Sequence, residues 1–355
     1  MTIDVVPQIF KGTVEKYGDR VAMRKKEHGL WHDISWNEYY RRAKYVGSAL
    51  LSMGLKKGDS VSIIGDNCPE WVIIDLGVQC VGGISVGVYS TNAWPQVEYV
   101  VQDSQSRFFF AENEEQLDKW LNFRENAPAL EKVIVWDLEG LRHFEDPMVM
   151  TYDDLLDYGR EAAEREPELF EKRMAEVTPE DVSVLIYTSG TTGPPKGAML
   201  THRNVTWMGR AITKEDPVYD DDEVMSFLPL CHIFERLFSV FVHITNGYTV
   251  NFIESPDTVT DNMKEISPTL GYAVPRIWEK YMSAVYIRMS DATWFKKLVF
   301  GLALKIGRNR ATLKMHFKTV PFYLEALYQL AYLAVFRKLK ERLGFERLRV
   351  AYSGA

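Results

Sequence analysis

The chain has 355 residues, of which 46% are hydrophobic and 26% charged, and its formal net charge at pH 7 is −7. This length and composition indicate a globular protein with a large core and exclude a low-complexity or repeat architecture. A net negative charge also gives no indication of nucleic-acid binding. The three cysteines (Cys68, Cys80 and Cys231) are odd in number and not spaced as metal ligands, so we expect buried thiols in a reducing compartment.

The N-terminal region lacks a basic segment followed by an apolar one, so the sequence predicts no secretory signal. The uncharged stretch 76–97 is long enough to span a bilayer, but several glycines, Pro95 and polar side chains interrupt it. We therefore expect a cytoplasmic protein that is soluble or peripheral at the inner face of a membrane.

Alternating strand and helix patterns run along the chain. Ser35 and Glu38 form a capping box before apolar residues at helical spacing, which predicts a helix that ends before Gly54. Strands are predicted at 60–65, 82–88, 107–111, 132–136, 182–186, 224–227, 248–252 and 269–272, and helices at 69–80, 152–158, 161–175, 233–245 and 275–289. This alternation predicts an α/β fold with layered helices and mostly parallel sheets.

A polar, charged region at 140–180 indicates a junction. We expect a first α/β subdomain at 1–177 and a second at 178–355, with a basic helical insertion at about 293–345. Residues 294–349 contain thirteen Lys or Arg against three Glu, which leaves about −17 on the remaining residues. Two explanations stay open: helices packed on the domain, with 322–336 buried, or a basic amphipathic element on an anionic bilayer.

The stretch 187–197, Tyr-Thr-Ser-Gly-Thr-Thr-Gly-Pro-Pro-Lys-Gly, follows a fully apolar strand pattern at 182–186. It is not a Walker A loop, because Lys196 is followed by Gly197. Clusters of Gly, Ser, Thr and Pro are usually surface turns. However, backbone N–H groups, hydroxyls and one ammonium can together bind a polyanion, and the natural ligand is a nucleotide triphosphate.

The amino-acid sequence of this stretch resembles the phosphate loop of the adenylate-forming superfamily, which includes acyl-CoA synthetases, luciferases and non-ribosomal adenylation domains. Two further blocks resemble the long-chain acyl-CoA synthetase branch: Leu-Pro-Leu-Cys-His-Ile-Phe-Glu-Arg at 228–236 and Ala-Val-Pro-Arg-Ile-Trp-Glu-Lys at 273–280. The segment 65–71, Gly-Asp-Asn-Cys-Pro-Glu-Trp, also resembles a segment of this branch. The resemblance implies the fold of the large N-terminal domain of these enzymes.

The resemblance implies a two-step ligation, in which a fatty acid is adenylated by ATP and the thiol of coenzyme A then displaces AMP. Lys196 and His232 are the implied catalytic residues, and Thr188 the implied ligand of Mg²⁺. The implied nucleotide-binding residues are Thr188, Ser189, Gly190, Thr191, Thr192, Gly193 and Lys196 in the loop and Ser353, Gly354 and Ala355 at the adenine. Glu235 and Arg236 are expected to pair with each other or with surrounding charges, and a homodimer is a further expectation.

Other segments of the family are not in this sequence, among them the Tyr-Gly-x-Thr-Glu segment and the C-terminal lid with its lysine. We therefore expect an N-terminal fragment that is poorly active or inactive alone. Two alternatives stay open: adenylation of a shorter or aromatic acid, and a non-catalytic nucleotide- or lipid-binding module.

Overall fold

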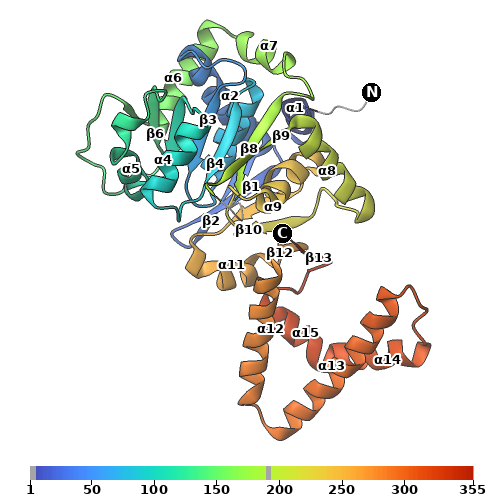
Figure 1. Cartoon of the computed structure of the whole chain (residues 1–355). Helices are drawn as coiled ribbons and strands as arrows, with labels where there is room; N and C mark the ends of the chain where they lie inside the picture. Colours follow the sequence, from blue (N-terminus) through green and yellow to red (C-terminus); the bar gives the residue numbers. More distant parts are fainter. Residues whose placement is uncertain (1–4, 189–192, 355) are drawn as a thin grey trace. The chain divides into compact units, whose positions relative to one another are not determined.

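A computed structural model of the chain describes residues 5–188 and 193–354 (Figure 1). The chain forms two compact units, Met1–Glu254 and Ser255–Ala355. This division differs from the one expected between residues 177 and 178. The reason is that β8 (Val182–Thr188) pairs with β4 (Ile84–Val88), so that the central strand belongs to the same sheet as the strands before it.

A seven-stranded sheet with the order β7-β6-β5-β3-β4-β8-β9 forms the centre of the first unit. Its remaining strands are β3 (Ser60–Ile64), β5 (Phe108–Ala111), β6 (Lys132–Val135), β7 (Val149–Thr151) and β9 (Lys196–Thr201). All neighbours are parallel except β8 and β9. Every residue of β3 and β5 is buried, as is typical of strands covered by helices on both faces.

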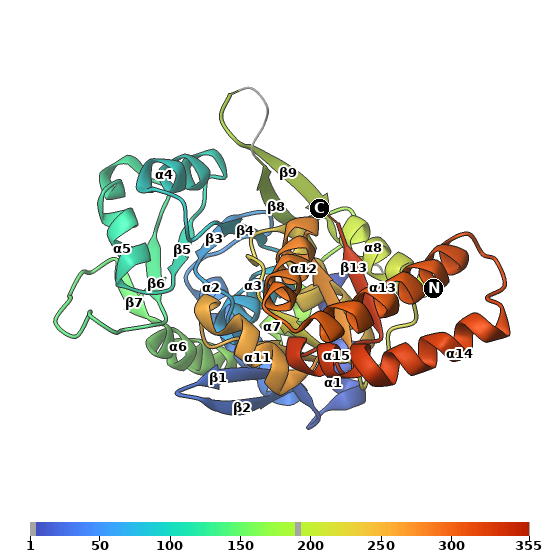
Figure 2. The same ribbon diagram turned by 90° about the horizontal axis from the view of Figure 1, so that it is seen from below.

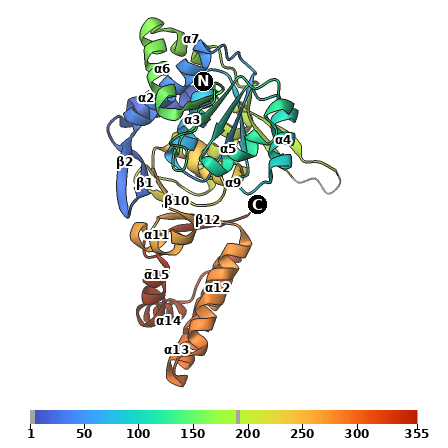
Figure 3. The same cartoon turned by 90° about the vertical axis from the view of Figure 1, so that its left-hand side faces the viewer.

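Two sets of helices cover this sheet. One set contains α2 (Trp36–Ser52), α3 (Pro69–Cys80), α6 (Tyr152–Arg165) and α7 (Leu169–Ala175), and the other α4 (Trp94–Asp103) and α5 (Glu114–Leu121). Figure 3 shows α2, α6 and α7 on one side of the strands and α4 on the other. The predicted break near residue 159 is wrong: α6 continues to Arg165 and ends before Pro167, which disfavours helix in the preceding residue.

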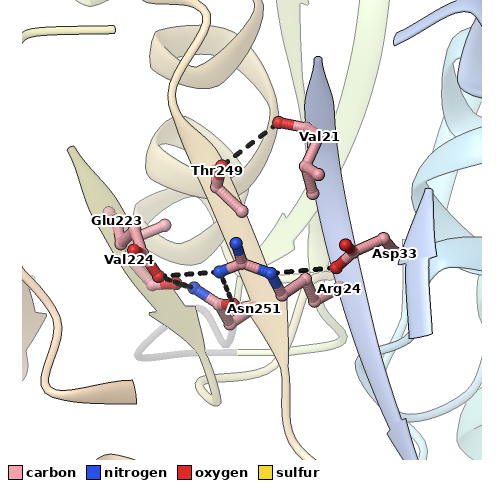
Figure 4. Close-up of polar contacts among 7 residues, drawn as sticks. All are labelled: Val21, Arg24, Asp33, Glu223, Val224, Thr249 and Asn251. Carbon is pink, nitrogen blue, oxygen red and sulfur yellow. Dashed lines mark hydrogen bonds and ion pairs between the residues drawn. The ribbon is translucent and has the colours of Figure 1, made fainter. Parts of the chain in front are cut away.

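A smaller sheet has the order β10-β11-β1-β2, formed by β10 (Glu223–Ser226), β11 (Thr249–Phe252), β1 (Val21–Glu27) and β2 (Leu30–Ser35). Arg24 joins its strands: the guanidinium donates to Asp33 (3.0 Å), to Glu223 (2.9 Å) and to Asn251 (3.3 Å), as Figure 4 shows. The sequence did not predict β1 and β2, because the charged run from Arg24 to Glu27 has no clean apolar alternation.

The other elements of this unit are α1 (Val6–Tyr17), a 3₁₀ turn at Arg124–Asn126, α8 (His202–Glu215), α9 (Ile233–Arg236), a π-helical turn at Leu237–Val242 and α10 (His243–Asn246). The last three are continuous in the chain, so the helix predicted at 233–245 is present with an internal π turn. The three cysteines are free and buried, as expected from the composition.

The second unit is mainly helical. It contains a 3₁₀ turn at Pro256–Thr258, α11 (Val259–Ile266), β12 (Leu270–Ala273), α12 (Pro275–Ser290), α13 (Trp294–Met315), α14 (Phe322–Ala331), a π turn at Tyr332–Phe336, α15 (Arg337–Leu343) and β13 (Val350–Ser353). Strands β12 and β13 pair in parallel. Helices α13 and α14 pack on each other (Figure 2), and Arg310 on α13 donates to Glu325 on α14 at 2.7 Å.

The packed faces of these helices leave several large apolar side chains exposed. Phe300 and Ala303 of α13 are buried, whereas Leu302 is 55% exposed. Phe322 at the start of α14 is 89% exposed. The structure therefore contradicts the explanation in which the segment 322–336 is buried.

Candidate active site

Strands β8 and β9 form an antiparallel hairpin, and the glycine-rich stretch connects them. Thr188, the last residue of β8, lies directly opposite Lys196, the first residue of β9, in the antiparallel register. Both side chains are exposed, and Gly193 has a φ of +92°, a value that favours glycine. Figure 2 shows this hairpin extending beyond the sheet. The predicted phosphate-binding residues Ser189, Gly190, Thr191 and Thr192 lie outside the described residues.

Helix α4 holds the base of this hairpin. The hydroxyl of Tyr187, next to Thr188, donates to Asp103 at 2.7 Å, and the hydroxyl of Tyr99 donates to the carbonyl of Pro195 at 2.9 Å. Burial, together with the hydrogen bond to Asp103, raises the pKa of Tyr187, so its hydroxyl stays a donor. The two ends of the loop are thus fixed on one rigid support, a feature that sequence reasoning missed.

The order of the strands places a topological switch point between β3 and β4. From β3 the chain passes through α3 to β4, and from β4 it returns through α4 to β5, on the other side of β3. In open α/β sheets, ligands bind beyond the carboxyl ends of the strands at such a point. Strand β8, which leads into the loop, is the next neighbour of β4 on this sheet.

Acidic and polar residues occupy this edge. Asp66, which follows β3, accepts a hydrogen bond from the hydroxyl of Ser90, which follows β4, at 2.8 Å. The backbone N–H of Asp66 donates to the carboxyl group of Glu112, which follows β5, at 2.8 Å. Burial raises the pKa of Glu112 to about 7. The loops after three neighbouring strands are therefore linked to one another.

The segment 228–232 crosses the same edge and is held there by Asn67. The amide nitrogen of Asn67 donates to the carbonyl of Leu228 at 2.6 Å, and its amide oxygen accepts from the N–H of Leu230 at 3.2 Å. Gly87 of β4 permits this approach, since a Cβ there would lie 2.7 Å from the Cα of Cys231. The tertiary structure therefore brings the block around His232 over the ends of β3 and β4.

His232 caps the N-terminus of α9 with its imidazole. Nδ1 accepts a hydrogen bond from the N–H of Phe234 at 3.1 Å. This hydrogen bond requires an unprotonated Nδ1, so the hydrogen of the neutral ring is on Nε2. The side chain is half-buried, and burial lowers the pKa of His232. At neutral pH the residue is therefore an uncharged N–H donor.

Glu235 and Arg236 do not pair with each other, which corrects one of the two expected arrangements; Arg236 instead pairs with a surrounding charge. The fully buried carboxylate of Glu235 accepts from the hydroxyls of Ser226 (2.7 Å) and Ser239 (2.6 Å) and from the N–H of Leu228 (3.0 Å). Arg236, also fully buried, forms an ion pair with Asp75 of α3. These contacts of both residues hold the segment in place.

Two predicted adenine-binding residues are in the second unit. Ser353 ends β13, and the N–H of Gly354 donates to the carbonyl of Ala273 at 3.4 Å. Ala355 lies outside the described residues. The adenine-binding role of this segment remains a prediction.

Thr188 fits a role in holding a magnesium ion beside a nucleotide. Its side chain is exposed at the carboxyl edge, and Mg²⁺ usually keeps several waters and binds one or two protein oxygens together with substrate phosphates. The described residues contain no group of three or more His, Cys, Asp or Glu that could form an all-protein cage.

Comparisons with known proteins agree with this geometry. The family model described as AMP-binding enzyme matches residues 10–334. The chain is 32% identical to a long-chain-fatty-acid–CoA ligase from Homo sapiens, over 98% of this chain and 52% of the human protein. It is 30% identical to one from Xenopus laevis, over 99% of this chain and 47% of that protein. The chain thus spans about half the length of the curated relatives it matches.

Solved structures share the fold. An anthranilate CoA ligase in complex with anthranoyl-AMP superposes with a TM-score of 0.66 and 21% identity, over 76% of this chain and 50% of that one. A long-chain-fatty-acid-CoA ligase from Archaeoglobus fulgidus has a TM-score of 0.63 and 19% identity, over 76% of this chain and 51% of that one. The fold expected from the sequence, that of the large N-terminal domain of adenylate-forming enzymes, is confirmed. From the family match and the relatives together, the chain belongs to the AMP-binding enzyme family.

Proposed function

We propose that this chain carries the nucleotide- and acid-binding part of an ATP-dependent ligase that activates long-chain fatty acids and transfers them to coenzyme A. One observation carries the proposal: the hairpin bearing Thr188 and Lys196 starts at the same sheet edge that the His232 segment crosses. The sequence similarity to long-chain-fatty-acid–CoA ligases supports the choice of acid.

The chemical difficulty of the first step is electrostatic, because a carboxylate must approach a polyphosphate that is also negative. A cation at the base of the loop reduces this repulsion and stabilises the negative charge of the leaving pyrophosphate. Lys196 is suited to that role since its ammonium is exposed at the loop base. Loop N–H groups would bind the phosphate oxygens, as in other anion-binding loops.

Thr188 would hold Mg²⁺ together with the phosphates, and the ion would supply further neutralisation of the polyphosphate when bound. The proposed role of His232 is different. A neutral imidazole with Nδ1 engaged by the backbone presents Nε2–H as a donor, and in this role it would position the carboxylate or the carbonyl oxygen of the adenylate. A donor of this kind places the acid without adding a second negative charge.

Equilibrium binding of ATP to the 355-residue chain tests the loop directly, because binding does not require turnover. We expect ATP to bind in the presence of Mg²⁺ and Lys196→Ala to weaken its affinity by about tenfold or more, as for a hydrogen bond to a charged group. The matched control is Lys214→Ala, a change of another exposed lysine in the same unit. Equal affinities of both variants and the parent chain would reject the assignment of the loop.

The identity of the acid substrate is tested by measuring exchange between ATP and pyrophosphate in the presence of carboxylic acids with different acyl chain lengths. An optimum at long acyl chains supports the proposal. An optimum at a short or aromatic acid favours the corresponding alternative. Because the chain alone is expected to be poorly active, these exchange measurements use the chain fused to the C-terminal half of a full-length relative. ATP binding without exchange for any acid in that fusion favours a non-catalytic nucleotide-binding module.

A further inference from the structure

Helices α13 and α14 bear large apolar side chains on the side that faces away from their mutual contact. On α13, Trp294 is 76% exposed, Phe295 60% and Leu302 55%; on α14, Phe322 is 89% and Leu330 65% exposed. We call these residues, together with Leu298, Tyr323 and Leu333, the outer face. A soluble helix normally turns such residues inward and polar ones outward. Exposed apolar surface of this kind marks a site of interaction.

Cations lie beside this face. A groove of about 660 Å³ runs between α12 and α13, with apolar residues such as Phe300 and Leu304 along it. Its charged lining residues are Lys297, Lys305 and Arg308, and no acidic side chain lines it. The guanidinium of Arg308 donates to the hydroxyl of Tyr286 at 3.2 Å, which leaves its other N–H groups to a ligand. The groove is therefore suited to an anionic group attached to an apolar body.

The turn after α13 has an unusual residue at its tip. Phe317 is 99% exposed and has a φ of +51°, in the left-handed region where glycine is normally found at a helix C-terminus. The N–H of Lys318 donates to the carbonyl of Leu313 at 2.9 Å and closes the turn. A phenylalanine here is strained and buries nothing within the described residues, so its side chain serves neither the turn nor the core.

We propose that the outer face, the cationic groove and Phe317 together form a surface that binds an anionic phospholipid bilayer. The charge argues for this partner, since residues 294–349 carry thirteen Lys or Arg against three Glu. The described part of the chain has no helix that is long and apolar enough to cross a bilayer. The geometry instead fits helices lying in the interface, with aromatic side chains among the acyl chains and cations at the headgroups.

A second copy of the chain is the main rival as the partner. In a dimer formed through this surface, each copy would contribute an excess of about ten positive charges. The repulsion between these charges disfavours self-association at low salt. The lipid proposal does not depend on the ligase activity, because binding to vesicles is measured without substrate. Its failure would leave the proposed function unaffected.

The test is co-sedimentation of the full chain with phosphatidylcholine vesicles, with and without phosphatidylserine. We expect strong binding only with phosphatidylserine, weakened by salt. The double variant Lys297→Glu/Lys305→Glu should lower partitioning at least about tenfold, since each cation near an anionic surface contributes roughly fivefold. The control Lys172→Glu/Lys214→Glu makes the same change of net charge in the first unit and should bind like the parent chain.

Phe317→Gly separates the lipid role from a structural one. Glycine relieves the strained backbone, so we expect an unchanged or higher Tm together with weaker binding to anionic vesicles. Leu298→Ser/Leu302→Ser should also weaken binding, whereas Leu30→Ser, a similarly exposed leucine of the first unit, should not. Absence of binding to anionic vesicles, or a dimer in sedimentation that the serine variants dissociate, would overturn the proposal.

Discussion

Arg236 and Asp75 form an ion pair in which both side chains are completely buried. The pair joins the His232 block to α3, the helix that leads from β3 to β4 at the switch point. Its surroundings are also polar: Arg236 donates to the hydroxyl of Ser85 at 2.6 Å, and Asp75 accepts from the amide of Gln79 at 2.9 Å. The position of the candidate site on the sheet therefore depends on a buried charge network.

Removing one partner of this pair should destabilise the fold strongly. Asp75→Asn or Arg236→Met leaves an uncompensated buried charge, which costs about 3–5 kcal/mol. The double variant should cost less than the sum of the two, because it buries no unpaired charge. Urea unfolding of the parent chain and the three variants gives these values, and additive effects would show that the two residues do not interact.

Lys196→Ala should separate chemistry from stability. Its side chain is exposed, so we expect the urea midpoint to change little. A contact to the leaving group in such a site is worth about 3–4 kcal/mol, so adenylation should fall by a factor of 100 to 1000 if the parent chain supports exchange. Lys214→Ala provides the comparison for the loss of a surface charge. Equal exchange rates in all three proteins would contradict the role of Lys196.

Asn67→Ala should disturb the site through position and not through contact with substrate. The amide holds the carbonyl of Leu228 and the N–H of Leu230, and leaving these groups unpaired should cost about 1–3 kcal/mol each. We expect weaker binding of the acid with a smaller change in ATP affinity, because the loop is supported separately by α4. A parallel loss of both affinities would point to general unfolding, which circular dichroism detects.

Stability should decrease as the pH falls below about 6.5. Burial lowers the pKa of His202 to about 4 and that of His243 to about 3. Between these values and about 6.5 the unfolded chain binds protons at these histidines that the folded chain does not, so acid favours unfolding. At about pH 5 each histidine should cost about 2 kcal/mol relative to neutral pH. His202→Leu should reduce this pH dependence of the urea midpoint, and an unchanged slope would contradict it.

The local sequence predicted much of the first unit. The helix 69–80 agrees with α3 to the residue, and five strands of the seven-stranded sheet (β3, β4, β5, β6 and β8) were placed within two residues of their observed ends, whereas β7 and β9 were not predicted. These elements have a strong signal because buried parallel strands are continuously apolar and the helices between them have clear caps. The loop at 188–196 was likewise predicted from its amino-acid sequence alone.

Only the tertiary structure decided which distant residues meet. Nothing in the sequence near Asn67 indicates that its amide binds the backbone of Leu228 and Leu230, because the partners are more than 160 residues apart. The pairing of Arg236 with Asp75 was missed for the same reason. The outward orientation of Leu302 and Phe322 follows from how α13 and α14 pack, which periodicity within one helix does not specify. Local patterns determine elements and chemistry, whereas the packing of helices on the sheets determines which side chains share a site.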